Sequence, residues 1–332
     1  MLPNEPCLLT VILNWRTAEM TLRAAAAALR EMEGIAGEII LVDNDSQDGS
    51  FEAMQAHAAD QGWTRVRVLQ SGHNGGFGAG NNVGIRAGLS SGQRPDYVYI
   101  LNSDAFPDPG AINALLRHLQ THPDTGFAGS YIHGPDGDPH LTSFRFPSIT
   151  SEFEGAARLG PVSRWLGHRA VPVPIPEITT PVDWLAGASL MMRMDVLEKT
   201  GLFDEEFFLY FEETDLCHRA KIAGYQTDFV RESEVTHIGS ASTGMKEWRT
   251  VPTYWFASRR HYFVKTHGVP YAVLATLAHL AGGGLHRLRC ALTGRRPTDP
   301  PRFLRDLLLQ ELRRQTRPDR GTEPGTTPVN GV

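Results

Sequence analysis

Cysteine is scarce in this sequence, with three residues among 332. Cys7, Cys217 and Cys290 are far apart, and no two of them have the spacing of a metal-binding or redox motif. This excludes a cysteine-based metal or redox site, and so few cysteines are typical of a reducing compartment. We expect all three to be packing residues.

Long apolar runs are also missing. No run reaches the roughly 18 residues of a membrane-spanning helix, and the N-terminus lacks the basic and apolar regions of a signal peptide. The catalytic body is therefore expected to be cytoplasmic. Its length allows one large α/β domain or two smaller ones.

Charge is distributed unevenly. The net charge is -5, but residues 259–320 contain 13 Lys and Arg against 4 Asp and Glu, a net charge of +9. Glu323 is the only charged residue after them, so residues 1–258 carry -13. An acidic body with a basic tail does not predict nucleic-acid binding by the core. It predicts that the tail contacts an anionic surface such as a membrane.

Strand-like and helix-like segments alternate through the first 122 residues. Apolar runs predict strands at residues 8–13, 38–42, 66–69 and 97–101. Helical patterns predict helices at residues 17–32, 50–61, 81–88 and 111–122. This alternation predicts the α/β class, with a doubly wound, mostly parallel sheet flanked by helices.

Each predicted strand ends in a polar cluster. Asn14 follows the first strand, residues 43–48 the second, a glycine-rich loop the third, and residues 102–104 the fourth. The carboxyl ends of parallel strands share one edge of a sheet, which is where open α/β sheets bind ligands. We therefore expect the site at this edge.

The glycine-rich loop spans residues 72–82, follows a strand and opens a helix. Its free N–H groups could face a phosphate or a sugar. It is not a P-loop, because no Lys follows the glycines, and it does not follow the first strand as a dinucleotide-binding loop does. A flexible surface loop is the alternative, which Asn81 and Asn82 make less attractive.

Residues 43–50 offer two roles. Ser46 or Asp48 can cap the helix that follows. Asp43, at the strand end, can accept a hydrogen bond from a pyrimidine N–H or a ribose hydroxyl. We expect different residues of this run to serve each purpose.

The fourth strand ends at Asn102, Ser103 and Asp104. One interpretation is a turn cap. The other is a cation site, because Mg²⁺ and Mn²⁺ commonly share one or two carboxylates with a substrate diphosphate. Asn102 could add a carbonyl oxygen or orient a metal-bound water. His237, at a later strand end, could reach the same cation, although a lone His is more often structural.

Three carboxylates, Glu212, Glu213 and Asp215, follow an aromatic run and begin a predicted helix. Acidic residues in a first turn favour the helix dipole, which is the structural explanation. An aromatic wall would also raise a carboxylate pKa by desolvation, which suits a general base. Only one or two can face a site, so the others would cap the helix or pair with Arg219 or Lys221.

The later part of the chain is less regular. Residues 130–181 are rich in Pro and Gly and predict an irregular binding loop or lid. Residues 182–192 predict a strand, and residues 226–230 another that leads to His237.

The C-terminal part predicts basic helices. Residues 271–292 mix small apolar residues with His and Arg, and residues 282–284, all glycine, should interrupt the helix. A helix pair on an anionic leaflet, a helical extension packed on the body, and a dimer contact are the alternatives. The basic excess favours the membrane surface. Residues 318–332, rich in Pro, Gly and Thr, should be disordered.

With these motifs in place, the chain resembles glycosyltransferase family 2, inverting enzymes with a GT-A fold, and most of all its rhamnosyltransferase-like branch. The resemblance covers about residues 8–240, and its pieces appear in the family's order. They are residues 10–15, 38–49, 74–84, 97–104 and 184–237.

The resemblance implies roles. Residues 102–104 correspond to the D-x-D motif, with Asn102 in place of the first Asp. Residues 212–215 match an E-D-x-D pattern, which places Glu213 at the catalytic base and leaves Glu212 or Asp215 as alternatives. The metal would be held by Asp104 and His237. The nucleotide-sugar site would comprise Asn14, Asp43, Asn74, Gly75, Gly76, Asn81, Asn102, Ser103, Asp104, Trp184 and Gly187.

The implied reaction is a single inverting displacement. A nucleoside-diphosphate sugar, with dTDP-rhamnose as the leading hypothesis, would bind with Mg²⁺ or Mn²⁺, and the base would deprotonate a hydroxyl of a glycan or lipid-linked acceptor. Another donor on the same scaffold, a nucleotidyltransferase and a non-catalytic carbohydrate-binding protein are the alternatives. The expected organisation is a GT-A domain at 1–250, divided into nucleotide-binding (1–105) and acceptor (106–250) halves, and a basic helical extension at 251–317.

Overall fold

The computed structural model describes residues 6–239 and 250–312. A nine-stranded sheet has the order β3-β2-β1-β4-β10-β6-β11-β5, with β8 paired to β11 outside this path, and β7 and β9 form a separate pair. The strands are β1 (Cys7–Asn14), β2 (Ala36–Asp43), β3 (Val66–Gln70), β4 (Tyr97–Asn102), β5 (Ala105–Pro107), β6 (Thr125–His133), β7 (Ser143–Phe144), β8 (Thr180–Val182), β9 (Trp184–Leu185), β10 (Ser189–Arg193) and β11 (Gln226–His237). The α-helices are α1 (Ala18–Glu31), α2 (Ser50–Asp60), α3 (Phe77–Ala87), α4 (Ala111–Thr121), α5 (Ile149–Ala157), α6 (Gly160–Leu166), α7 (Met194–Thr200), α8 (Glu212–Ile222), α9 (Thr253–His267), α10 (Val269–Thr293) and α11 (Phe303–Leu312).

The sheet is mostly parallel. β1 pairs in parallel with β2 and β4, β2 with β3, and β6 with β11, so six of the nine strands have a parallel partner. β10 runs antiparallel between β4 and β6. β1 and β4 are buried along nearly their whole length, as strands covered on both faces should be. The predicted α/β class and doubly wound sheet are confirmed.

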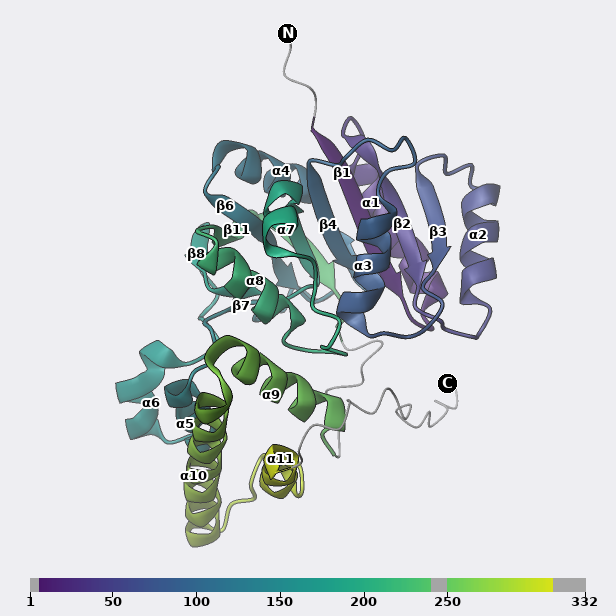
Figure 1. Cartoon of the computed structure of the whole chain (residues 1–332). Helices are drawn as coiled ribbons and strands as arrows, with labels where there is room; N and C mark the ends of the chain where they lie inside the picture. Colours follow the sequence, from purple (N-terminus) through teal and green to yellow (C-terminus); the bar gives the residue numbers. More distant parts are fainter. Residues whose placement is uncertain (1–5, 240–249, 313–332) are drawn as a thin grey trace.

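Helices cover both faces of the sheet (Figure 1). On one face, α1 and α4 contribute Ala24 and Leu115 to a core with the strands. On the other, α3, α7 and α8 contribute Ile85, Leu197 and Leu216. The three cysteines are free and buried, as expected of packing residues.

Several predicted boundaries are wrong. α3 begins at Phe77 rather than at Asn81, because the chain enters the helix directly from the glycine loop. The segment 130–181 is not irregular throughout, since it contains α5 and α6, and Ser148 caps α5 in a capping box with Ser151. The strand predicted at 182–192 is broken into β9 and β10.

The glycines at 282–284 do not interrupt α10. A Cβ on Gly282 would lie 2.6 Å from the Phe153 carbonyl oxygen, and a Cβ on Gly283 would lie 2.7 Å from a Leu304 methyl carbon. These residues therefore allow α10 to approach α5 and α11 closely, and this packing stabilises the helix. Their lower helix propensity, about 1 kcal/mol each relative to Ala, is offset by tertiary contacts.

The C-terminal helices join α5 and α6 in a layer below the sheet (Figure 1). A buried ionic network connects three of them: Glu152 of α5 pairs with Arg259 of α9 at 3.0 Å and with His279 of α10 at 2.6 Å. None of the described helices is both long and apolar enough to cross a membrane. The disorder predicted for residues 318–332 lies outside the described residues.

Candidate active site

The polar strand ends meet at one edge of the sheet. The register pairs Asn14 with Asp43 across β1 and β2, and Leu13 with Asn102 across β1 and β4. β11 reaches the same edge, because its last residue, His237, pairs with Ala105, which directly follows Asp104. Asn102 and Asp104 are thereby neighbours of His237, which lies more than 130 residues further along the chain.

Asp43 lies in a buried polar network and is 1% exposed. Its Oδ1 accepts hydrogen bonds from Asn14 Nδ2 at 2.7 Å and from Ser46 Oγ at 2.5 Å, whereas its Oδ2 accepts one from Ser46 N at 3.2 Å. A carboxylate oxygen accepts two hydrogen bonds, so Oδ2 retains capacity for another donor. Of the two capping candidates, Ser46 is bound to Asp43, and Asp48 Oδ1 accepts the N–H of Ser50, the first residue of α2.

The glycine loop is held in place by tertiary contacts. Asn74 Oδ1 accepts hydrogen bonds from Asn44 Nδ2 at 2.9 Å and from Gly76 N at 3.0 Å. The Phe208 carbonyl accepts the N–H of Phe77, the first residue of α3. Gly76 has a φ of 89°, and a Cβ there would lie 1.8 Å from the Phe208 oxygen, so only glycine fits. The loop is not a freely flexible surface turn.

Two buried acceptors beside this loop lack a protein partner. Asn44 Oδ1 and Asn81 Oδ1 have no hydrogen-bond partner in the described part of the chain. Asn81 is fully buried and donates to the Phe77 carbonyl at 3.0 Å. Gly75 lies against Ala79, where a Cβ would come within 2.7 Å of the alanine methyl. Unpaired buried acceptors are rare in folded proteins and are compatible with a polar ligand nearby.

Backbone strain gathers at this edge. Seven described non-glycine residues have positive φ, and five of them lie in three segments beside the site. Three flank the Asn14–Asp43 network, and two directly precede α8. They are Arg16, Asp45, Gln47, Tyr210 and Phe211, with φ between 55° and 72°. Strained residues cluster at functional sites, because only over-determined surroundings hold them in place.

Asp104 and His237 form the candidate cation site. Asp104 is 5% exposed, and its Oδ1 lies 3.0 Å from His237 Nε2. Gly239 N donates to Asp104 Oδ2 at 3.1 Å, and Asn102 Nδ2 lies 3.5 Å from the same His237 nitrogen. The neighbouring Ser103 accepts a hydrogen bond from Thr17 rather than facing His237. One carboxylate and one imidazole side by side are a donor set that fits a divalent cation.

A second group of metal-ligand type was not predicted. Asp108, His133 and Glu234 are partly buried, and their ligand atoms lie within 4.8 Å of one another. His133 Nε2 is 2.8 Å from Asp108 Oδ2, and Arg231 pairs with Glu234 at 2.6 Å, so all three ligand-type side chains already have protein partners. Asp108 lies beyond β5 from Asp104, which separates the two groups by about 10 Å of strand.

The acidic start of α8 contains two glutamates with different environments. Glu212 is 1% exposed, and its Oε2 has no hydrogen-bond partner among the described residues. Burial and the adjacent Glu213 raise the pKa of Glu212 well above its usual range. Glu213 is half-buried, its Oε1 accepts the Gly187 N–H at 3.1 Å, and burial raises its pKa too.

Asp215 is held in ion pairs, as one of the three acids was expected to be. It is 2% exposed, and its carboxylate lies 2.8 Å from Arg219 and 2.8 Å from Lys265 of α9. Trp184 stacks on Phe144 with ring centroids 4.1 Å apart and donates its indole N–H to a backbone carbonyl. The ion pairs fix the position of the Asp215 carboxylate, and the stacking and hydrogen bond fix the position of the Trp184 indole.

The site also contains groups that sequence reasoning missed. The Phe208 carbonyl packs on Gly76, and Phe77 packs on Gly187, where a Cβ would lie 3.0 Å from the ring and 2.6 Å from Glu213 Oε1. Backbone carbonyls and a lone Phe have no local sequence signal, so only the three-dimensional arrangement reveals them.

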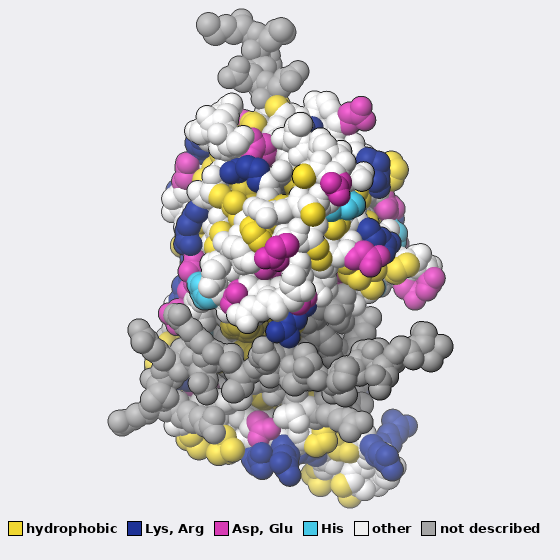
Figure 2. Space-filling view, turned by 90° about the vertical axis from the view of Figure 1, so that its right-hand side faces the viewer, with side chains coloured by type: hydrophobic (Ala, Val, Ile, Leu, Met, Phe, Trp, Pro, Cys, Tyr) yellow, Lys and Arg dark blue, Asp and Glu magenta, His cyan; other side chains and the backbone are white. Residues whose placement is uncertain are grey.

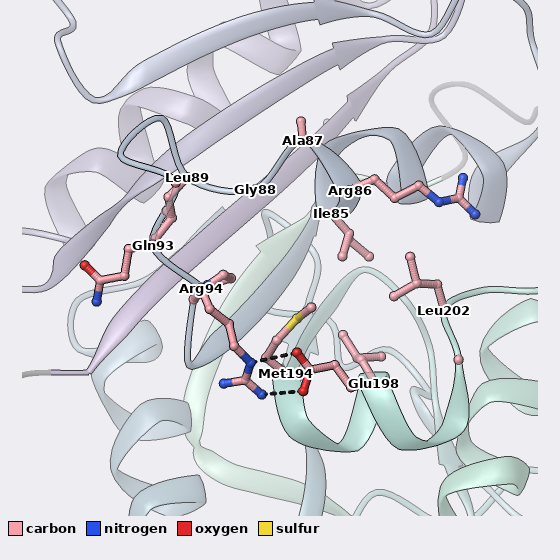
Figure 3. Close-up of a pocket in the computed structure, with 14 residues that line it drawn as sticks. Ile85, Arg86, Ala87, Gly88, Leu89, Gln93, Arg94, Met194, Glu198 and Leu202 are labelled. Carbon is pink, nitrogen blue, oxygen red and sulfur yellow. Dashed lines mark hydrogen bonds and ion pairs between the residues drawn. The ribbon is translucent and has the colours of Figure 1, made fainter.

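A cavity of about 560 Å³ lies away from this edge. Its lining includes Ile85, Met194 and Leu202, and Arg94 pairs with Glu198 across it at 2.7 Å (Figure 3). Arg94 lies in the loop just before β4, which begins at Tyr97. The cavity is therefore at the amino end of that strand, opposite the polar edge. It contains none of the predicted site residues.

Comparison with known proteins agrees with these features. The family described as Glycosyl transferase family 2 matches residues 10–166. The chain is 33% identical over 238 residues to an N-acetylglucosaminyl-diphospho-decaprenol L-rhamnosyltransferase of Mycobacterium tuberculosis H37Rv, covering 67% of this chain and 75% of that one. It is 27% identical over 195 residues to the rhamnosyltransferase WbbL of Escherichia coli K12, covering 56% of this chain and 71% of the relative.

A solved structure shares the fold. The mannosyltransferase PcManGT of Pyrobaculum calidifontis, determined with GDP-Man and Mn²⁺, superposes with a TM-score of 0.53 at 13% identity, covering 93% of this chain and 88% of that one. The sheet, the ordered motifs and the rhamnosyltransferase relatives agree. The chain therefore belongs to glycosyltransferase family 2, in its rhamnosyltransferase-like branch.

Proposed function

We propose that this chain is an inverting glycosyltransferase of the hexosyltransferase type, which transfers rhamnose from dTDP-rhamnose to a hydroxyl of a lipid-linked glycan in cell-surface polysaccharide synthesis. The observation that carries the proposal is that one half-buried carboxylate, Glu213, and a carboxylate–imidazole pair, Asp104 and His237, occur together in a chain of a family whose members transfer sugars. The rhamnosyltransferase relatives support the choice of sugar.

Glu213 is the proposed general base. Its Oε1 is oriented by the Gly187 N–H, and burial raises its pKa, which strengthens it as a proton acceptor. It would take the proton of the acceptor hydroxyl, whose oxygen then bonds to the anomeric carbon as the bond to the diphosphate breaks. One displacement inverts that carbon and needs one carboxylate rather than the pair used by retaining hydrolases.

The other two acids suit supporting roles. Glu212 is 1% exposed and therefore lacks the access that an acceptor requires, whereas Asp215 is neutralised by Arg219 and Lys265. Glu213 is the only one of the three that is not fully buried. This difference in access favours it over its neighbours.

Asp104 and His237, with Asn102 beside them, would hold Mg²⁺ or Mn²⁺. The donor set fits such an ion, and the structural neighbour determined with Mn²⁺ supports the same chemistry here. The ion would neutralise negative charge that develops on the departing diphosphate.

The nucleotide half would be built from the other strand ends. Asp43 would accept a hydrogen bond from the base through Oδ2, with Asn14 fixing its orientation. Trp184 and Gly187, which are held in place by their packing contacts, would line the sugar and acceptor side of the site. The diphosphate and sugar would lie against Asn74, Gly75, Gly76, Asn81, Ser103 and Asp104.

The proposed organisation has three parts. Residues 1–105 bind the nucleotide, residues 106–250 form the acceptor and catalytic half, and residues 251–317 form the basic extension. A lipid-linked acceptor would place the enzyme at the cytoplasmic face of the cell membrane. The relative whose name specifies a decaprenol-linked substrate supports that acceptor class.

Donor screening tests the proposal. The full chain is incubated with dTDP-rhamnose, UDP-sugars and GDP-sugars, with Mn²⁺ or with EDTA, and nucleoside diphosphate release is measured. We expect turnover with dTDP-rhamnose that EDTA removes. Preference for another donor would refute the sugar assignment, and failure of every nucleoside diphosphate to raise the melting temperature would refute the transferase proposal.

A further inference from the structure

The outer face of α10 is apolar along its whole length. Its exposed residues are Val269, Pro270, Val273, Leu274, Leu277, Ala281, Gly284, Leu285, Leu288, Ala291, Leu292 and, at the last position, Thr293. Leu277, Leu288 and Leu292 are 53%, 57% and 79% exposed. We define the outer face of α10 as this set from Val269 to Leu292.

Most polar residues of α10 lie away from this face. Thr276 and His286 are buried, His279 pairs with Glu152 of α5, and Arg287 and Arg289 are partly buried. A surface helix of a soluble protein normally buries its apolar face and exposes its polar face. α10 has the opposite arrangement, because its apolar face is exposed. The exposed residues recur every three or four positions, which aligns them into a stripe about 29 Å long from Val273 to Leu292. A contiguous apolar surface of this kind marks an interaction site.

Positive charge borders this stripe. Arg295 and Arg296 are exposed directly after α10, and Arg302 is exposed before α11. The three described acids of this region, Asp299, Asp306 and Glu311, are each paired with an arginine. Figure 2 shows hydrophobic and basic side chains together at the lower end of the molecule. Within the described residues, Arg295, Arg296 and Arg302 have no carboxylate partner.

The surrounding charge indicates that a membrane, rather than a second copy of the chain, covers the outer face of α10. α10 contains no Asp or Glu, so a second α10 would cover the leucines but would offer nothing to neutralise the arginines. An anionic bilayer supplies acyl chains for the leucines and phosphates for the arginines together. α10 is not apolar enough to cross a bilayer, which fits a helix that lies in the interface.

We propose that the outer face of α10, with Arg295, Arg296 and Arg302, is a docking surface for an anionic phospholipid membrane. The exposed Leu308, Leu309 and Leu312 of α11, which packs on α10 at Gly283, extend the apolar surface. The inference deepens the proposed function and rests on it for its purpose, since docking would bring the active site to a lipid-linked acceptor.

Vesicle flotation of the full chain tests the docking surface. Wild type should float with vesicles of phosphatidylcholine and phosphatidylglycerol, and much less with phosphatidylcholine alone. Leu277→Glu/Leu288→Glu should lower the bound fraction by about tenfold or more, because each charge must enter the interface. The matched control is Ile178→Glu/Ile222→Glu, which adds the same charge at residues that are 73% and 75% exposed and lie outside the C-terminal helices, and it should float like wild type.

Charge reversal and sedimentation complete the test. Arg295→Glu/Arg296→Glu should weaken flotation only with the anionic vesicles. Failure of wild type to float, equal flotation of Leu277→Glu/Leu288→Glu, or a wild-type dimer that this variant dissociates would each overturn the proposal. Circular dichroism establishes that the variants fold. Donor turnover without vesicles is measured in parallel, so that loss of the proposed function is recognised separately from loss of docking.

Discussion

Replacement of Glu213 by Gln tests the proposed base with little change of shape. The glutamine carbonyl can still accept the Gly187 N–H, which lies 3.1 Å from Oε1, so the loop at Gly187 should keep its position. Only the ability to take a proton is lost. General-base catalysis contributes about 10²–10⁴ in rate, which corresponds to about 3–5 kcal/mol of barrier. We expect kcat to fall by this factor while the KM for the donor stays close to that of wild type.

The assay is nucleoside diphosphate release at saturating donor and acceptor, compared with Glu212→Gln. Glu212 is buried and does not face an acceptor, so this control should retain kcat within about threefold. Burial and Glu213 raise the Glu212 pKa, so the ionised carboxylate is less favourable in the folded chain than in the unfolded chain, and at neutral pH this difference destabilises the fold. Glu212→Gln should therefore raise the melting temperature at pH 7.

The pH profile supplies an independent readout. A base acts only when it is deprotonated, and burial raises the pKa of Glu213 above 4.5. The acid limb of the kcat profile should therefore lie above pH 4.5 and disappear from the residual activity of Glu213→Gln. Wild-type kcat in Glu213→Gln, together with a 10²-fold loss in a folded Asp215→Asn variant, would refute the assignment.

Three further changes test the site and its support. Gly76→Ala should raise the KM for the donor and destabilise the fold by several kcal/mol, because its Cβ would meet the Phe208 oxygen at 1.8 Å. Gly88→Ala, at a positive φ but with open space around it, should cost only the backbone strain, about 1–3 kcal/mol by chemical denaturation. Asp104→Asn or His237→Ala should weaken Mn²⁺ binding in calorimetry by at least about 10–100-fold, and unchanged binding would exclude this cation site. Burial opposes ionisation of Glu152, but Arg259 and His279 outweigh it and lower its pKa from 4.5 to about 2. This depressed pKa gives stability that is present above pH 4.5 and lost as pH falls toward 2, about 3 kcal/mol in wild type, so Glu152→Gln should flatten the dependence of unfolding free energy on pH in this window.

The features of the fold that could be predicted from the sequence are those set by residues close together in the chain. Continuous apolar runs such as residues 97–101 become strands buried on both faces, and the polar residues that end them meet at one edge because parallel strands share their direction. The acids at 212–215 begin a helix, as the dipole favours. These features need no knowledge of which distant segments pack together.

Features set by distant contacts were not predictable from local patterns. The glycines at 282–284 resemble a helix break, yet they lie inside α10 because α5 and α11 pack on them. The Asp108–His133–Glu234 group brings together residues from three segments, none of which has a metal-binding spacing. The choice among Glu212, Glu213 and Asp215 likewise rests on burial and on Lys265, which is 50 residues further along the chain.

The extension is expected to act as part of the catalytic unit rather than as a separable appendage. Lys265 of α9 pairs with Asp215 of α8 at 2.8 Å, and Phe207, just before α8, is buried in a cluster with Tyr262 and Phe263 of α9. α9 is joined in turn to α10 by the hydrogen bond from Arg259 to Thr276. A chain ending near residue 250 would leave Asp215 with Arg219 alone and would expose Phe207. The predicted boundary at 250 therefore divides two parts that share a core. α9, which supports the helix of the proposed base, is bonded directly to α10, which carries the proposed membrane surface.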